Sequence, residues 1–307
     1  MNFLSSKELL QKAMKEKYAV GAFNFQDLEI MQAIVDAAKL EKSPLILQTS
    51  EGAIEYAKLK YLHSMARVAL EDAKIPIALH LDHGKNFELT KKCIKLGYKS
   101  VMIDASEYGF EKNVKITRKV VEYAHRHNAS VEAELGRLKG VEDLVNVKDR
   151  NALLTDPYEA KEFVNKTGCD VLAIAIGTSH GAFKFKGKSN LDFDRLEKIR
   201  KKVKIPLVLH GASGVKKIVV KELKKLGAKL ENPHGVSNGD IKKAIKLGIS
   251  KINVDTDIRL ELFHVIRDVI FKQPSVFDIR KLLGPAREEI TKLVREKIRL
   301  FGSNNKI

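Results

Sequence analysis

Short apolar runs alternate along the chain with segments in which apolar residues recur every three or four positions. Eight runs, each ending in polar or glycine-rich residues, are residues 19–25, 44–50, 76–83, 100–106, 130–138, 171–181, 206–213 and 251–257. A short run that is apolar throughout predicts a strand buried on both faces. The spacing between successive runs leaves room for one helix and two loops.

The segments between these runs are predicted to be helices. Residues 27–40 carry apolar side chains at helical spacing, and residues 87–96 are followed by Gly97, which suits a helix end. Similar patterns cover residues 113–127, 158–167, 192–202 and 240–247.

Eight such strand–helix units predict an α/β fold, a (β/α)8 TIM barrel. No G-x-G-x-x-G motif follows the first run, which argues against a dinucleotide-binding sheet. We expect residues 1–307 to form a single TIM-barrel domain. A C-terminal helical extension, about residues 275–307, is expected to pack beside the barrel or at a subunit contact.

Composition excludes several classes of protein. The chain is 44% hydrophobic and 31% charged, too apolar for a disordered chain, and no apolar run reaches the roughly 18 residues of a membrane span. The N-terminus lacks the features of a secretion signal, and the two cysteines, Cys93 and Cys169, form no disulfide framework. We therefore expect a cytoplasmic protein.

The formal net charge is +17, from 56 basic and 39 acidic residues. Such an excess favours anionic partners, which include nucleic acid, membrane surfaces and phosphorylated metabolites. The lysines are spread along the whole chain, without a basic arm or a nucleic-acid-binding motif. We expect no nucleic-acid partner and no membrane partner.

Three histidines occupy equivalent places in the pattern. His83, His180 and His210 lie at the ends of the third, sixth and seventh runs, and a glycine follows each. In a TIM barrel the C-terminal strand ends carry the reactive groups, and three imidazoles with an open fourth position suit catalytic zinc. A single histidine there is more often a hydrogen-bonded core residue, but three together favour a metal site.

Carboxylates gather at the same strand ends: Asp82, Asp104, Glu132, Glu134 and Asp255. Near a divalent cation, such groups support the ligands or carry protons. Asp82 is the leading candidate because it adjoins His83, but neighbouring strand residues share a site only where the strand turns. Asp104 and Glu132 suit either support of the ligands or an ion pair inside the barrel.

Two glycine-containing segments add further candidate chemistry. Residues 211–214 and 253–256 follow the last two strands, where such barrels commonly hold a phosphate; the alternative is a glycine-rich turn without a ligand. Residues 136–143 are either a mobile lid that carries Glu142 or a plain solvated loop. Residues 177–181 match G-x-S-x-G, but the context of a hydrolase elbow is missing.

Together these residues resemble the class II, zinc-dependent fructose-1,6-bisphosphate aldolases over about residues 19–300. The matching motifs are Leu81-Asp82-His83-Gly84, Val131-Glu132-Ala133-Glu134-Leu135-Gly136, Gly177-Thr178-Ser179-His180-Gly181, Leu209-His210-Gly211-Ala212-Ser213-Gly214 and Asn253-Val254-Asp255-Thr256-Asp257. The resemblance implies a TIM barrel that reversibly cleaves fructose 1,6-bisphosphate to dihydroxyacetone phosphate and glyceraldehyde 3-phosphate. Zn2+ would stabilise the enediolate, as a Lewis acid does.

The resemblance also implies roles for individual residues. His83, His180 and His210 hold zinc, and Glu134 and Asp104 are further metal-contacting acids. Asp82 exchanges a proton with the C4 oxygen, and Glu142 exchanges one with C3. Substrate-binding positions, with a monovalent cation (Na+ or K+) nearby, are Asn24, Ser50, Gly181, Lys184, Gly211, Ser213, Asn253, Asp255, Thr256 and Arg280. Arg280 would reach the second phosphate from a neighbouring subunit of a homo-oligomer.

Three alternatives remain beside this interpretation. Tagatose-1,6-bisphosphate aldolases are close relatives, but they tend to have alanine at the position of Asp255. A lysine Schiff base would need a lysine at a strand end, and none faces the mouth by this pattern. A metal-free basic scaffold would have no need of the three histidines. Residues 229–239 depart from the family's usual short pattern by an apparent insertion between the last two strands. This departure concerns the packing of subunits, not the expected chemistry.

Overall fold

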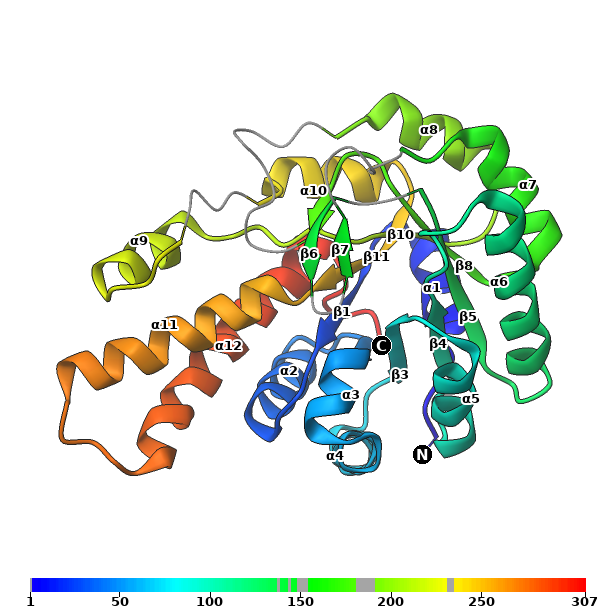
Figure 1. The fold of residues 1–307 in the computed structure, drawn as a ribbon. Coiled ribbons are helices and arrows are strands. Elements are labelled where there is room, and N and C mark those ends of the chain that lie inside the picture. Colours follow the sequence, from blue (N-terminus) through cyan, green and yellow to red (C-terminus); the bar gives the residue numbers. More distant parts are fainter. Residues whose placement is uncertain (1, 137–138, 143–144, 148–153, 181–190, 231–234) are drawn as a thin grey trace.

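Eight parallel strands close into a barrel in the computed structural model of the chain (Figure 1). The structure describes residues 2–136, 139–142, 145–147, 154–180, 191–230 and 235–307. In order around the barrel the strands are β1 (Val20–Asn24), β2 (Leu45–Ser50), β3 (Ile77–Gly84), β4 (Ser100–Ile103), β5 (Ser130–Leu135), β8 (Val171–Ile174), β10 (Leu207–Leu209) and β11 (Ile249–Val254). Each overlaps one predicted run, and the predicted TIM barrel is confirmed.

Side chains alternate between the inside and the outside of the barrel. Outward residues such as Leu79 belong to the apolar core between the strands and the helices, and inward residues such as Met102 form a second apolar cluster with helix α1 (Ser6–Glu16). Ser6 is hydrogen-bonded to Ser100 and Ser130, the first residues of β4 and β5. α1 therefore closes the N-terminal end of the barrel.

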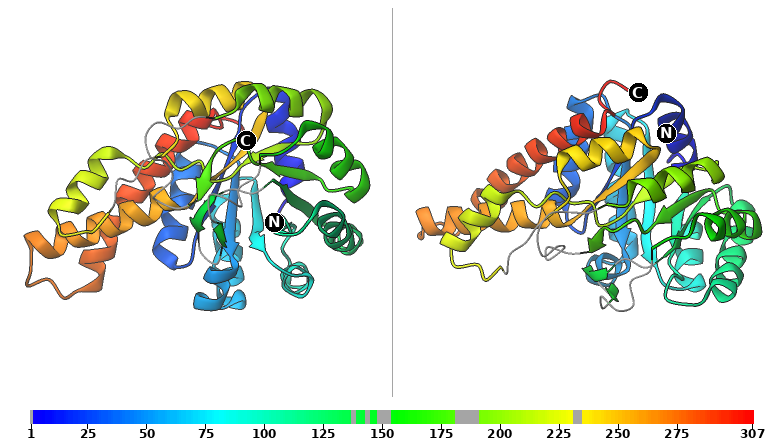
Figure 2. Two further views of the ribbon diagram at one scale, coloured as in Figure 1. Left: turned by 45° about the horizontal axis from the view of Figure 1, so that its top comes forward. Right: turned by 90° about the horizontal axis from the view of Figure 1, so that it is seen from above.

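Helices surround the barrel (Figure 2). They are α2 (Leu28–Leu40), α3 (Glu51–Ala57), α4 (Leu59–Ala73), α5 (Phe87–Leu96), α6 (Phe110–His125), α7 (Pro157–Thr167), α8 (Phe193–Lys202), α9 (Lys217–Lys225), α10 (Asn238–Lys246), α11 (Thr256–Lys272) and α12 (Ile279–Phe301). Local chemistry sets their ends: the Asp27 side chain accepts from the first turn of α2, and Gly97, with φ 119°, ends α5 as predicted. Within the described residues, no helix has the length and apolar character of a membrane span.

Two helices project beyond the barrel on one side, where α11 and α12 run out and back (Figure 1). α12 lies within the predicted C-terminal extension, and it packs against α2, where Arg295 and Arg299 bind Glu41. Large apolar side chains remain uncovered on the projecting part: Phe277 is 96% exposed and Phe271 is 73% exposed.

Most predicted runs are longer than the strands that they form, and two of them continue beyond the barrel. β8 ends at Ile174, and after a turn at Gly177 (φ 106°) the chain forms β9 (Ser179–His180), which is not part of the barrel. β5 ends before Gly136 (φ 90°), and residues 136–143, predicted as a lid or loop, include β6 (Lys139–Glu142). The prediction that these two runs stay in the barrel throughout is therefore wrong. A glycine with positive φ redirects the chain in both, directly after β5 and three residues after β8.

The strand that follows β6 completes a second, small sheet. β6 pairs antiparallel with β7 (Val145–Val147) and parallel with β9, so the order of this sheet is β7-β6-β9.

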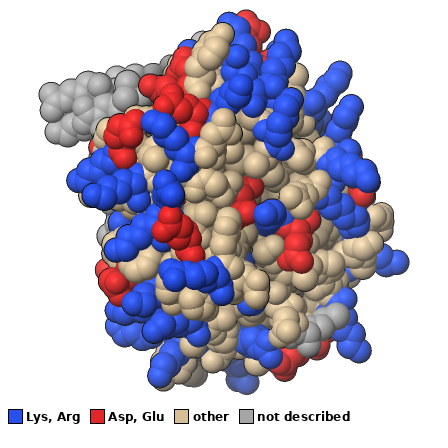
Figure 3. Space-filling model, turned by 90° about the vertical axis from the view of Figure 1, so that its right-hand side faces the viewer, with Lys and Arg blue, Asp and Glu red and all other residues tan. Residues whose placement is uncertain are grey.

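On the face of the molecule seen in Figure 3, Lys and Arg side chains are spread over the surface, with Asp and Glu side chains between them.

Candidate functional site

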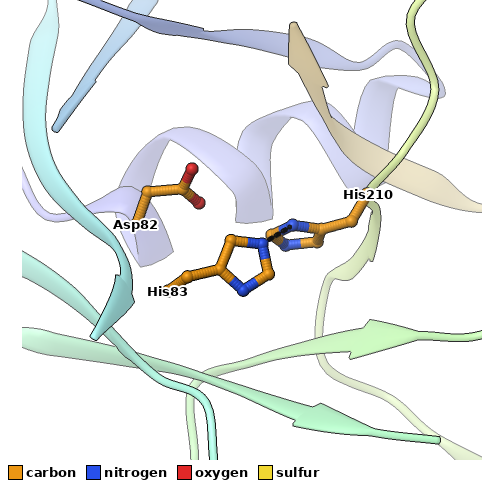
Figure 4. Close-up of side chains that lie close together, drawn as sticks. All are labelled: Asp82, His83 and His210. Atoms are coloured by element: carbon orange, nitrogen blue, oxygen red, sulfur yellow. Dashed lines mark hydrogen bonds between the residues drawn. The ribbon is translucent and has the colours of Figure 1, made fainter. Parts of the chain in front are cut away.

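Two histidines and an aspartate meet at the C-terminal end of the barrel (Figure 4). Asp82 and His83 lie at the end of β3, and His210 follows β10 directly. One ligand atom from each lies within 4.8 Å of the others, and all three residues are buried. A second group of this kind joins His83 to Asp104 and Glu134.

A turn in the backbone brings the neighbours Asp82 and His83 to one site. His83 has a left-handed φ of 47°, and the pairing of β3 with β4 shifts register there. The strand turns at the point where a shared site requires it. The glycines that follow the histidines are required by space, since a Cβ would lie 2.7 Å from a carbonyl oxygen at Gly84 and 2.5 Å from one at Gly211.

Each imidazole uses one nitrogen to bind a carboxylate and turns the other toward its neighbour. His83 Nδ1 lies 3.1 Å from Asp104 Oδ2, and His210 Nε2 lies 2.8 Å from Glu132 Oε1. The two remaining nitrogens, His83 Nε2 and His210 Nδ1, are 3.0 Å apart. The carboxylates therefore orient both rings, as they do for histidines that bind metals.

Opposed electrostatic effects act on the buried groups. Burial disfavours the imidazolium, but the charges of Asp82 and Asp104 outweigh it and raise the pKa of His83 to about 10. Burial, together with the charge of Asp104, raises the pKa of Glu134 to about 8. Glu134 Oε2 lies 4.0 Å from His83 Nδ1 and has no hydrogen-bond partner among the described residues.

Asp82 is held by side-chain amides from three strands. Asn24 Nδ2 and Gln48 Nε2 donate to Oδ2 at 3.0 and 3.3 Å, and Asn253 Nδ2 donates to Oδ1 at 3.0 Å. Burial acts against the carboxylate, but nearby positive charge, above all that of His83, lowers the pKa of Asp82 overall. An ionised, fixed carboxylate at this place is a competent proton acceptor.

The described residues fit a zinc ion. Imidazole nitrogens and carboxylate oxygens are ordinary zinc ligands, and two nitrogens on one tetrahedral zinc would be about 3.3 Å apart, close to the 3.0 Å between His83 and His210. Three buried oxygens near these groups have no hydrogen-bond partner among the described residues: Glu134 Oε2, Gln48 Oε1 and Asn253 Oδ1. Unpaired buried acceptors of this kind are expected where a ligand completes the site.

His180 and Glu142 are placed by their strands. His180 ends β9, and its backbone pairs with Gly140 of β6, the strand that ends at Glu142. A Cβ at Gly211 would meet the carbonyl oxygen of Ser179, so β9 runs beside the segment that begins at His210. The small sheet thus joins the predicted third ligand to the predicted lid acid.

The segment after His210 is held in place by a buried carboxylate. Asp257 accepts from the backbone N–H groups of Gly214 and Val215 at 2.8 and 2.7 Å, and Lys297 of α12 pairs with it at 2.5 Å. Val215 has a left-handed φ of 50°, which is costly for a β-branched residue. The predicted insertion contributes here, because Val236 N donates to Ser213 O at 3.1 Å.

The other predicted substrate residues fall into three groups. Ser50 caps α3, and Asp255, which Thr256 follows as the first residue of α11, binds Arg259 at the same end of the barrel. Arg280 is not brought to the site within one chain, since it binds Asp278 on the projecting part with its side chain 87% exposed. Gly181 and Lys184 lie outside the described residues.

Sequence reasoning missed three side chains. Gln48 contacts Asn24 and Asp82, Lys85 pairs with Asp104 at 2.8 Å, and Lys251 pairs with Glu132 at 2.8 Å inside the barrel. Lys251 has a signal in the sequence, because it lies on β11 two residues before Asn253 and so shares its inward parity.

Comparison with known proteins gives a consistent family assignment. The sequence model of the family described as fructose-bisphosphate aldolase class-II matches residues 4–306. A fructose-bisphosphate aldolase of Thermus caldophilus is 49% identical over 296 residues, which cover 96% of this chain and 97% of the relative. One from Helicobacter pylori (strain ATCC 700392 / 26695) is 47% identical over 305 residues, 99% of each chain.

Among solved structures, the YdjI aldolase from Escherichia coli K12 superimposes with a TM-score of 0.80 at 30% sequence identity. The match covers 99% of each chain.

Proposed function

The chain belongs to the class II fructose-bisphosphate aldolase family, and from this premise we propose that its described site performs the family reaction with zinc. The reaction is the reversible cleavage of fructose 1,6-bisphosphate to dihydroxyacetone phosphate and glyceraldehyde 3-phosphate, a step of glycolysis and gluconeogenesis. The observation that carries the zinc proposal is the pair of oriented imidazoles, whose facing nitrogens are 3.0 Å apart, beside the anchored carboxylate of Asp82.

His83, His180 and His210 would hold the zinc ion. When bound, zinc supplies a Lewis acid that stabilises the negative charge developing on substrate oxygens. Glu134, whose Oε2 has no hydrogen-bond partner among the described residues, would offer a further contact to the ion, and Asp104 orients His83. A monovalent cation, Na+ or K+, would sit near the phosphate-binding segments.

Two acids would move the protons. In the cleavage direction, the hydroxyl at C4 gives its proton to Asp82 while the C3–C4 bond breaks and leaves its electron pair on the C3 side. The lowered pKa of Asp82 and its amide donors keep it ready to accept. Glu142, carried by the small sheet, would then return a proton to C3.

The substrate phosphates would bind where backbone N–H groups and hydroxyls face the mouth. For dihydroxyacetone phosphate, the proposed positions are Gly181, Gly211, Ser213, Asn253, Asp255 and Thr256. Asn24, Ser50 and Lys184 would contact the substrate more weakly. The excess positive charge of the chain would help to steer a bisphosphorylated sugar.

Arg280 would reach the second phosphate of a partner's site in a homo-oligomer, a dimer or tetramer. Its place on the projecting α12, near the uncovered Phe271 and Phe277, supports a subunit contact there. The two free, buried cysteines agree with a cytoplasmic location. We also propose that residues 1–307 act as one domain, since strands from the whole chain close one barrel.

The deciding experiment is cleavage of fructose 1,6-bisphosphate coupled to triose phosphate detection. Treatment with EDTA should abolish activity, and added zinc should restore it. Activity that resists EDTA but is lost with borohydride would indicate a Schiff base and contradict the zinc proposal. Tagatose 1,6-bisphosphate, tested in parallel, shows which of the two sugars the protein prefers as substrate. The ion pair with Arg259 fixes the position of Asp255, the residue proposed to set this preference.

A further inference from the structure

A column of buried polar side chains descends from His210 along the inside of the barrel. Glu132 lies between His210 and Lys251, with its Oε1 2.8 Å from His210 Nε2 and its Oε2 2.8 Å from Lys251 Nζ. Below it, Lys251 Nζ lies 3.4 Å from His80 Nε2, and His80 Nδ1 lies 2.7 Å from Ser100 Oγ. The side chains of Glu132, Lys251 and His80 have no exposed surface.

An ion pair at this depth calls for a reason other than stability. Removing two charges from water is costly, and an apolar pair of similar volume is often no less stable. The strands paired with β11 and β5, which are β1 and β4, place apolar residues such as Val20 and Met102 inside the barrel. Lys251 and Glu132 therefore serve something that an apolar pair cannot.

Three contacts define the state of the His210 ring. The Glu132 carboxylate can only accept, so Nε2 carries the hydrogen. At the other nitrogen, Nδ1, the Asn253 amide donates at 3.1 Å and His83 Nε2 lies 3.0 Å away. Nδ1 is therefore the acceptor, and its lone pair faces the group of His83 and Asp82, where the proposed ion would sit.

A similar arrangement supports the other ligand. His83 Nδ1 binds Asp104, and Lys85 Nζ binds the same carboxylate oxygen at 2.8 Å. Each imidazole is thus backed by a carboxylate, and each carboxylate by a lysine. The two arrangements come from different strands, which makes the recurrence informative.

We propose that Lys251 is a positioning residue for the metal centre. Its ammonium holds Glu132 in place as an ionised acceptor, Glu132 holds the Nε2–H form of His210 and its ring orientation, and His210 Nδ1 is thereby presented to the ion. This inference rests on the zinc site proposed above. It also assigns the buried lysine a role other than Schiff-base chemistry, since Nζ is paired with Glu132.

The test compares zinc affinity, measured by competition with a chromophoric chelator, in the wild-type protein and in Lys251→Met. Loss of a group that orients a ligand typically costs about 10- to 100-fold in metal affinity, and we expect a loss in that range. The matched control is Lys7→Met, which removes a lysine from another buried carboxylate, Asp170, and should leave zinc affinity unchanged. The double variant Lys251→Met/Glu132→Gln leaves no unpaired buried charge, and it should show the same loss even if the single variant folds poorly.

A measurement on the wild-type protein needs no variant. Imidazole 15N shifts in the zinc-free protein should report His210 as a single Nε2–H tautomer. An Nδ1–H tautomer, or a folded variant at position 251 with wild-type zinc affinity, would overturn the inference and leave the proposed function intact. A wild-type protein that binds no zinc would instead contradict the proposed function itself.

Discussion

The substitution Asp257→Asn tests how the proposed phosphate-binding segment, residues 211–215, is held. In the structure, the two carboxylate oxygens of Asp257 accept from Val215 N and Gly214 N, and the second also binds Lys297. An asparagine offers one acceptor oxygen, so its NH2 group must face one of these donors. At least one hydrogen bond to a charged group is lost while the volume of the side chain is kept.

The magnitude follows from that one bond. A hydrogen bond to a charged group contributes about 1.5–3 kcal/mol, which corresponds to roughly 10- to 150-fold in an equilibrium constant. The left-handed φ of Val215 adds strain that these contacts help to offset. If phosphate binds only the observed conformation, KM for fructose 1,6-bisphosphate should rise by up to this factor, with a smaller fall in kcat.

Steady-state kinetics and competition by inorganic phosphate would measure the effect. Lys297→Met should raise KM less, because both backbone N–H groups keep their acceptors. The control is Glu41→Gln, which weakens another buried anchor of α12, its pairs with Arg295 and Arg299, away from the site. A KM within twofold of wild type in Asp257→Asn, alongside normal zinc content, would refute the reasoning.

Four further predictions concern the proposed site and the subunit contact. His180→Ala should lower zinc affinity by more than about 100-fold, beyond the range for an outer partner; unchanged zinc content would argue against a ligand role. Glu142→Ala should keep zinc but slow exchange of the C3 proton by about 10²–10⁴-fold, measured with dihydroxyacetone phosphate in deuterated water. Asp255→Ala should bring the kcat/KM values for fructose and tagatose bisphosphates closer together, and an unchanged ratio of the two values would argue against a role of Asp255 in this preference. Phe271→Asp should lower the mass seen by light scattering, because it places a charge in the proposed contact; an unchanged mass would locate the contact elsewhere.

The succession of strands and helices, and most of the polar strand ends, could be predicted because they follow from local patterns. Continuous apolar runs mark buried parallel strands, and the barrel topology then brings distant strand ends such as Asp82 and His210 together. The departure of His180 into a separate sheet could not be predicted in the same way. It depends on the positive φ of Gly177 and on pairing with β6, which is a tertiary contact.

The buried pair of Lys251 and Glu132 shows a different limit. Parity along β11 places Lys251 inside the barrel, yet its partner lies on β5, which two strands, β10 and β8, separate from β11 around the closed sheet. Only closure of the barrel brings the two charges within 2.8 Å, so no local pattern could name the partner. The sequence left Glu132 between two roles, support of a ligand and a barrel ion pair, and in the structure it contacts both His210 and Lys251.

The distribution of polar residues divides the barrel interior into two halves with different tasks. Toward the N-terminal ends of the strands, apolar side chains pack with α1 and supply burial, beside the small hydrogen-bonded side chains of Ser6, Ser100 and Ser130. Toward the C-terminal ends, the inward positions carry carboxylates, amides and imidazoles that bind one another, and this arrangement sacrifices some burial. A barrel selected for stability alone would fill that half with branched apolar residues. These charges are instead kept in fixed pairs. That is the expected cost of a site whose binding side chains must be oriented before the substrate or ion arrives.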